Sequence, residues 1–240
     1  MPNLSEPTMK LSEGLDREDR DQDQDSRPMA ECRAAGGCAD GRRTDPFSCL
    51  VVGVGGQGAV LASRLVAHAC MAQGMFVRTA ETIGMSQRGG SVASHVRAAA
   101  TAEDVPSSMI PPRRANLVLA FEPAEGVRVF SQLAPGAAMV CSTRPVVPGS
   151  AAMSGYTGKP QVEWLAEHVG AGRFTAVDPA VLEREGLSVK CSNVLLLGAA
   201  AQMGALPFGK DELLQAIRTL VKPRLVEMNE KALELGMSLA

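Results

Sequence analysis

Residues 47–58 read FSCLVVGVGGQG, a short apolar run that passes directly into glycines. A continuous run of this kind is typical of a strand that is buried on both faces of a parallel sheet. Residues 57–73 follow with alanine, leucine and valine at helical spacing, and Gly74 is placed to end that helix. Residues 75–80 return to an extended pattern. The stretch therefore predicts a β-loop-α-β unit.

The alternation of extended and helical patterns continues to the end of the chain. Pro123 is placed in a first helical turn, where proline is tolerated, and Asp178 is placed to cap a helix. Further strands are expected at residues 91–97, 116–121, 137–141 and 174–177, and further helices at residues 123–133, 161–169, 192–203, 210–220 and 223–235. This order predicts an α/β fold, a Rossmann-like open and mostly parallel sheet with helices on both faces and a helical C-terminus.

The first 46 residues do not fit this pattern. They hold seven Lys or Arg residues against eleven Asp or Glu residues, and residues 16–25 read DREDRDQDQD without one apolar side chain. Such a segment cannot offset the entropy of ordering it, which is about 1–2 kcal/mol per backbone residue. We therefore expect a disordered acidic N-terminal extension over residues 1–46, followed by one α/β domain over residues 47–240.

Composition excludes several classes of protein. The chain has no run of 18 apolar residues and its acidic N-terminus has no continuous apolar segment, so we expect a cytoplasmic protein without a membrane span or secretory signal. The net charge of −2 gives no electrostatic footprint for nucleic acid. The six cysteines are scattered without a CxxC pair, which favours reduced thiols over a disulfide framework.

Residues 53–58 satisfy the spacing G-x-G-x-x-G between the expected first strand and first helix. Glycines allow a tight turn, and the N–H groups at the start of a helix attract an anion. One interpretation is a nucleotide or phosphate site, and the other is that the glycines only let the helix pack closely on the strand. The candidate binding residues are Gly53, Gly55, Gly56, Gln57 and Gly58.

A dinucleotide site would also need an acidic residue about 20 positions further on, at the end of the second strand. Glu81 lies 23 positions beyond Gly58, which is late for a ribose contact. We include Glu81 among the candidates, but a solvated or salt-bridged glutamate is the favoured interpretation.

The segment 81–91, ETIGMSQRGGS, joins two expected strands and has little to bury. Arg88 is suited to binding a carboxylate or phosphate with two hydrogen bonds, and the glycines beside it allow close backbone approach. The alternative is a tight turn whose arginine caps a helix or pairs with Glu81. The candidates for ligand binding or subunit contact here are Gln87, Arg88, Gly89, Gly90 and Ser91, together with His95, which follows the loop closely.

No catalytic or metal-binding signature accompanies these loops. None of the three histidines has a second ligand at metal spacing, and there is no G-x-S-x-G elbow or Walker A lysine. We therefore assign no catalytic residue and expect no metal on this chain.

Several stretches together resemble a known family. Residues 50–61 (LVVGVGGQGAVL), 78–97 (RTAETIGMSQRGGSVASHVR), 119–125 (LAFEPAE), 177–179 (VDP) and 193–198 (NVLLLG) occur in the same order, as does the tail 227–236. They resemble the gamma domain of pyruvate/2-oxoacid:ferredoxin oxidoreductases, and within that family the beta subunits of the indolepyruvate type. The chain departs from the family in its acidic extension and in Ile83, where histidine is expected in many indolepyruvate-type members.

The resemblance implies an accessory subunit of a complex that oxidatively decarboxylates a 2-oxoacid, with aryl pyruvates favoured. It implies that a large catalytic partner subunit holds thiamine diphosphate, Mg²⁺ and a [4Fe-4S] cluster, that CoA is a co-substrate, and that electrons leave to ferredoxin. This chain has neither a GDG motif followed by asparagines nor a CxxCxxC run, so no cofactor is expected on it. The alternatives are a stand-alone NAD(P)-dependent Rossmann dehydrogenase and a nucleotide-binding module.

Overall fold

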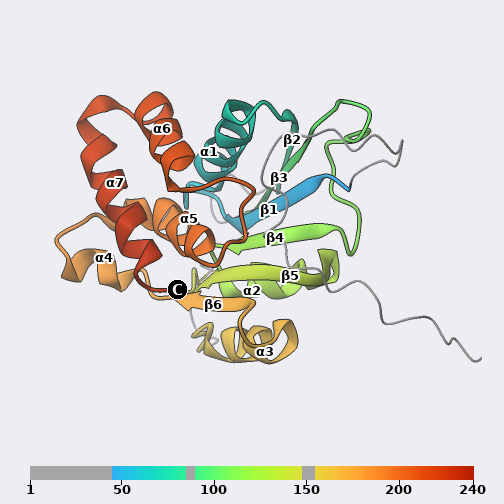
Figure 1. The fold of residues 1–240 in the computed structure, drawn as a ribbon. Helices are drawn as coiled ribbons and strands as arrows, with labels where there is room; N and C mark the ends of the chain where they lie inside the picture. Colours follow the sequence, from blue (N-terminus) through green and yellow to red (C-terminus); the bar gives the residue numbers. More distant parts are fainter. Residues whose placement is uncertain (1–44, 85–89, 148–154) are drawn as a thin grey trace, which may run out of the picture. The chain divides into compact units, whose positions relative to one another are not determined.

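A six-stranded sheet with helices on both faces forms the domain (Figure 1). The computed structural model describes residues 45–84, 90–147 and 155–240. The expected extension, apart from Asp45 and Pro46, lies outside the described residues, and so do Gln87, Arg88 and Gly89.

The elements alternate along the chain as the sequence predicts. In chain order they are β1 (Phe47–Val54), α1 (Ala59–Ala72), β2 (Phe76–Ile83), β3 (Ser91–Ala99), β4 (Ala115–Ala120), α2 (Pro123–Arg128), β5 (Leu133–Ser142), α3 (Lys159–Val169), β6 (Phe174–Val177), α4 (Ala180–Arg184), α5 (Ser192–Gln202), α6 (Lys210–Leu220) and α7 (Pro223–Met237).

The strand order is β2-β3-β1-β4-β5-β6. Strands β1, β4, β5 and β6 are parallel to one another, whereas β3 is antiparallel to both of its neighbours, β1 and β2. The predicted open and mostly parallel sheet is confirmed. In contrast to a simple β-loop-α-β unit, the second strand does not lie beside the first, because β3 is inserted between them.

Two apolar cores cover the two faces of the sheet. On one face, Cys49 and Val51 of β1 pack with α1 and α5, and α6 and α7 pack on these two helices in turn. On the other face, Leu50 and Val52 pack with α2 and α3. The alternation of β1 side chains between two buried faces explains why its sequence is apolar throughout.

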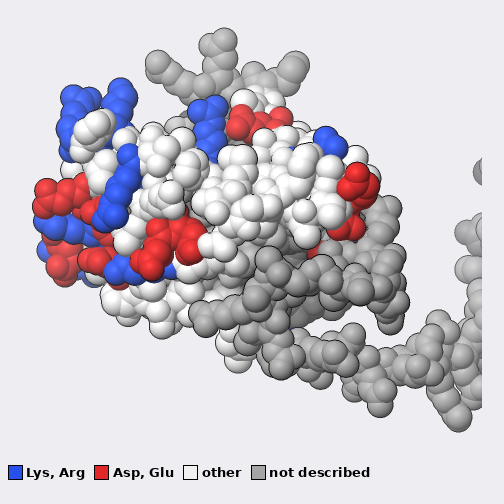
Figure 2. Space-filling model, turned by 45° about the horizontal axis from the view of Figure 1, so that its top comes forward, with Lys and Arg blue, Asp and Glu red and all other residues white. Residues whose placement is uncertain are grey.

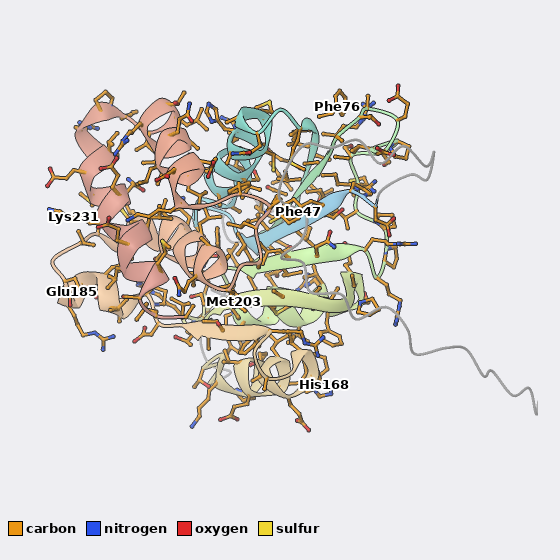
Figure 3. The ribbon with its side chains drawn as sticks, viewed as in Figure 1. Phe47, Phe76, His168, Glu185, Met203 and Lys231 are labelled. Atoms are coloured by element: carbon orange, nitrogen blue, oxygen red, sulfur yellow. The ribbon has the colours of Figure 1, made fainter. Side chains whose placement is uncertain are left out.

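Charged side chains gather over α6 and α7, at the left of the face shown in Figure 2, while the middle of that face is uncharged. Ion pairs link the two helices, with Lys210 Nζ 2.7 Å from Glu234 Oε1 and Arg218 Nε 2.6 Å from Glu230 Oε1. Lys231, which projects from α7 (Figure 3), pairs with Glu227 within the same helix. These pairs are largely solvent-exposed and screened by water, so they contribute little to stability.

The bounds predicted from the sequence are wrong for two elements. The helix expected at residues 123–133 ends at Arg128, and a 3-10 turn over Phe130–Gln132 follows. Strand β5 then begins at Leu133, although the apolar pattern suggested residue 137, because Ala115 pairs with Leu133 across an irregular register. The other expected helices and strands are present within a few residues of their predicted bounds.

No helix in the described parts of the chain is long and apolar enough to cross a membrane.

Helices α5 and α7 approach each other at two glycines. A Cβ on Gly236 would lie 2.0 Å from the carbonyl oxygen of Leu195, and one on Gly198 would lie 2.2 Å from that of Leu233. The crossing point therefore has room only for backbone. Both glycines belong to the stretches 193–198 and 227–236 that carry the family resemblance, so a packing constraint accounts for glycine at these two positions.

Replacing Gly236 with alanine is expected to lower the free energy of unfolding by about 2–4 kcal/mol, because α5 and α7 must move apart. Helix propensity alone would give the opposite sign, a gain of about 1 kcal/mol. Thermal or urea unfolding of Gly236→Ala, with the exposed Arg224→Ala on the same helix as control, measures the difference. A stability equal to wild type would show that the helices do not touch there.

Candidate functional site

The first glycine loop and the described ends of the second, Gly84 and Gly90, lie together at the carboxyl end of β1. Gly55, in the turn after β1, donates its N–H to the carbonyl oxygen of Gly90 at 3.0 Å. Gly84 donates its N–H to the carbonyl oxygen of Ser91 at 2.8 Å, and this hydrogen bond closes the β2–β3 hairpin at the end where its loop begins. Because β3 runs antiparallel to β1, the first residue of β3, Ser91, lies opposite the last residue of β1, Val54. This edge is where open α/β sheets gather ligands.

The side chain of Gln57 fixes the shape of the first glycine loop. Its Oε1 accepts from the N–H of Val54 at 2.7 Å, and its Nε2 donates to the carbonyl of Phe121 at 2.9 Å. The amide thereby bridges the ends of β1 and β4. A Cβ on Gly53 would lie 2.7 Å from Gln57 Oε1, so glycine at 53 is what lets the side chain fold back. Gln57 is a structural member of the loop.

Helix α1 begins at Ala59 because Gly58 adopts φ 82°, a left-handed conformation that glycine enters without a Cβ penalty. Asn193, the second residue of α5, lies against this glycine, and its Nδ2 is 3.4 Å from the Gly58 carbonyl oxygen. No side chain caps the helix. The first N–H groups of α1, together with exposed Gly55 and Gly56, therefore form a surface suited to an anion.

Glu81 and His95 lie away from this surface. Glu81 is an exposed residue of β2, in register with Ser94 of β3, which in turn is in register with Val51 of β1. Strand β3 thus separates Glu81 from the glycine loop, as the favoured interpretation of a solvated glutamate requires. His95 is only 3 % exposed, and its Nδ1 accepts from the N–H of Ile110 at 3.3 Å. Burial lowers the pKa of His95, in keeping with a neutral acceptor.

A network of two buried carboxylates lies beside Ser91. Neither glutamate was among the candidate residues predicted from the sequence. Glu122 and Glu125 are 2 % and 6 % exposed. Glu122 Oε2 accepts from the N–H of Glu125 and caps α2, while its Oε1 accepts from the hydroxyl of Tyr156. Glu125 Oε2 accepts from the Ser91 hydroxyl at 2.6 Å and its Oε1 lies 3.4 Å from Arg128 Nη2.

The network joins three segments that are distant in sequence: the start of β3, the start of α2 and residue Tyr156, shortly before α3. Burial first, and then the hydrogen bond and charge of Glu122, raise the pKa of Tyr156, so its hydroxyl stays a donor. The pattern Glu-Pro-x-Glu after a strand signals a capped helix at 122–125. It does not reveal that Ser91 and Tyr156 are the partners.

The described residues expose no thiol and no metal ligand set at this edge. The thiols of Cys49, Cys70, Cys141 and Cys191 are buried. Burial, with a smaller effect of Glu122, raises the pKa of Cys141 to about 12, which keeps it protonated. Within residues 45–84, 90–147 and 155–240 no group of three His, Cys, Asp or Glu residues could hold a metal ion. What the edge offers is hydrogen bonding and close backbone approach.

Replacing Gln57 with alanine is expected to lower the free energy of unfolding by about 1–3 kcal/mol, because the Val54 N–H and the Phe121 carbonyl lose their partner. Gln57→Glu keeps the shape but turns the donor toward Phe121 into an acceptor, so it should destabilise at least as much. Urea unfolding of both variants measures the effect, with Gln202→Ala at the partly exposed end of α5 as control. Wild-type stability in Gln57→Glu would contradict the bridging role.

The chain matches the sequence model of the family described as pyruvate ferredoxin/flavodoxin oxidoreductase over residues 48–239. Among curated relatives, the indolepyruvate oxidoreductase subunit IorB of Thermococcus kodakarensis is 34 % identical over 196 residues, covering 81 % of this chain and 96 % of the relative. The protein with the same name from Archaeoglobus fulgidus is 36 % identical over 196 residues, covering 81 % and 95 %.

Solved structures share the fold. The gamma subunit of a keto/oxoacid ferredoxin oxidoreductase from Geobacter sulfurreducens aligns with a TM-score of 0.57 and 19 % identity, covering 81 % of this chain and 98 % of that one. The pyruvate oxidoreductase subunit PORC of Thermotoga maritima aligns with a TM-score of 0.58 and 17 % identity, covering 82 % and 97 %. By its match over residues 48–239 and its relatives of over 30 % identity, the chain belongs to the pyruvate ferredoxin/flavodoxin oxidoreductase family, as a gamma-type member.

Proposed function

We propose that this chain is the accessory subunit of a 2-oxoacid:ferredoxin oxidoreductase of the indolepyruvate type. The relatives that it matches over almost their full length bear the name of an indolepyruvate oxidoreductase subunit. In this proposal the complex decarboxylates an aryl pyruvate oxidatively and forms an acyl-CoA, and ferredoxin receives the electrons. A large catalytic subunit is the partner in the hetero-oligomer.

The cofactors belong to the partner in this proposal. Thiamine diphosphate with Mg²⁺ would supply the carbanion chemistry of decarboxylation, and a [4Fe-4S] cluster would carry the electrons. The thiols described for this chain are buried, so they are unsuited to ligating a cluster. The contribution of this chain is to bind and orient, through the edge that carries both glycine motifs.

One observation supports the proposed role of that edge: the hydrogen bond from the Gly55 N–H to the Gly90 carbonyl joins the first glycine loop to the end of the second. Helix α1 points its uncapped N-terminus at the same surface. A 2-oxoacid carboxylate and the phosphates of CoA are anions, which backbone N–H groups and a guanidinium bind well. Arg88 lies outside the described residues, and its part in the site is a proposal that rests on its position in the sequence between Gly84 and Gly90.

The topology argues against the stand-alone dinucleotide-binding dehydrogenase. In that class the acidic residue that binds the ribose lies at the end of the strand next to β1. Here the inserted strand β3 occupies that position, and Glu81 is on the strand beyond it. The Gln57 side chain also spans the ends of the parallel strands β1 and β4, where the reversal of strand order would otherwise open a crevice.

Gly55→Ala tests whether another molecule approaches the loop closely. A Cβ at this position would lie 3.8 Å from the Gly90 carbonyl oxygen, an ordinary contact, so the isolated subunit should keep its melting temperature. In the complex reconstituted with the catalytic subunit, turnover or subunit affinity should fall at least about tenfold. Gly53→Ala serves as the contrasting variant, because it clashes within the subunit itself. Unchanged turnover and affinity in Gly55→Ala would remove the loop from the site.

Arg88→Ala tests the ligand contact. The loss of one charge-assisted hydrogen bond costs about 1.5–3 kcal/mol, so turnover of the reconstituted complex should fall roughly ten- to over a hundredfold. The assay follows CoA-dependent ferredoxin reduction with indolepyruvate, alongside subunit affinity and melting temperature. Glu81→Ala is the control, since its exposed side chain lies beyond β3. Full activity in Arg88→Ala would exclude a functional role for this arginine.

A further inference from the structure

A polar groove lies at the edge of the sheet opposite the glycine loops, at the amino ends of β1 and β4. It has a volume of about 570 Å³, which is in the range of small-molecule sites. We call it the arginine groove, because three guanidinium groups line it: Arg97, Arg113 and Arg114. None of the candidate residues named from the sequence belongs to it.

Arg97 brings a buried positive charge to the groove. This residue of β3 is only 7 % exposed. Its Nη1 donates to the carbonyl oxygens of Ser107 at 2.8 Å and Met109 at 3.4 Å, whereas its buried Nε has no hydrogen-bond partner. Arginine stays protonated in proteins even where burial lowers its pKa, as it does here. The buried positive charge of Arg97 is therefore hydrogen-bonded to carbonyl oxygens and forms no salt bridge among the described residues.

Arg113 is held in a strained conformation at the rim. Its φ of 59° is the only positive value among the described non-glycine residues. The backbone is fixed there by hydrogen bonds from the N–H groups of Arg113 and Arg114 to the carbonyls of Ser131 and Gln132. The exposed side chain lines the groove. A glycine would fit this conformation better, so strain is stored at a position that also presents a guanidinium.

The two acidic residues of the groove are already engaged. Asp45 Oδ2 is 2.9 Å from Arg114 Nη1, and Asp104 Oδ2 accepts from the hydroxyl of Thr101 at 2.9 Å. No carboxylate of the described residues forms a salt bridge with Arg97 or Arg113. Three guanidinium groups against two carboxylates leave an excess of positive charge along the groove, which suits a phosphate anion.

We propose that the arginine groove binds the phosphate of a phosphorylated small molecule, with the phosphate between Arg97 and Arg113. Arg113 presents its guanidinium from the rim, and the guanidinium of Arg97 adds its positive charge from the wall. Ser48 and Asn116 also line the groove, beside the phosphate subsite. The proposal does not depend on the function proposed for the glycine loops, because it involves other residues at the other edge of the sheet.

The test uses inorganic pyrophosphate as the probe and the full chain as the protein. Isothermal titration of wild type should show saturable binding. Arg113→Gly is the decisive variant, because glycine relieves the positive φ while it removes the charge. Its melting temperature without ligand should equal or exceed that of wild type, and its affinity for pyrophosphate should fall at least about tenfold. Arg64→Ala removes an exposed arginine from α1 and should leave the affinity unchanged.

Two results would overturn the proposal. One is the absence of saturable pyrophosphate binding to the wild-type chain. The other is wild-type affinity in Arg113→Gly, which would make any observed binding unrelated to the groove. Arg97→Lys provides a second check, since it keeps the charge but removes the planar guanidinium. Its affinity should also fall, and a folded Arg97→Lys with wild-type affinity would contradict the role of the buried guanidinium.

Discussion

The side-chain amide of Gln57 is the interaction on which the candidate site depends. It pairs with the N–H of Val54 and the carbonyl of Phe121, two backbone groups that the ends of β1 and β4 leave open. With both amide atoms engaged in this way, the turn after β1 has one conformation. That conformation directs Gly55 toward Gly90 and starts α1 at the same edge. Glycine at 53 is required because any side chain there would displace Gln57.

Contacts from distant parts of the chain support this loop. Asn193 rests on Gly58 from the start of α5, and α5 is positioned in turn by its close contact with α7 at Gly198 and Gly236. On the other side of the edge, Glu125 accepts a hydrogen bond from the Ser91 hydroxyl, which links the β2–β3 hairpin to α2. The stretches that resemble the family are therefore not independent signatures. Their described parts are linked by the contacts of Gln57, Ser91, Asn193, Gly198 and Gly236.

Much of the fold follows from sequence, because apolar runs, helical spacing and capping residues are local. The β1 run, Gly74 at the end of α1 and Pro123 at the start of α2 are examples. The insertion of β3 between β1 and β2 was not predictable in this way, since the pairing partner of a strand leaves no mark on its own periodicity. The network of Glu122, Glu125 and Tyr156 was missed for a similar reason. Its hydrogen bonds from Ser91 to Glu125 and from Tyr156 to Glu122 each span 34 positions.

We propose that the edge carrying both glycine motifs faces the catalytic subunit or the ligand that it holds. Hydrogen–deuterium exchange of this subunit, alone and in complex with the catalytic subunit, is the test. Protection on complex formation should be largest in peptides covering residues 53–61 and 83–92. Little change is expected in α6 and α7, whose exposed side chains are already paired with one another. Protection confined to α6 and α7, with the two glycine segments unchanged, would contradict it.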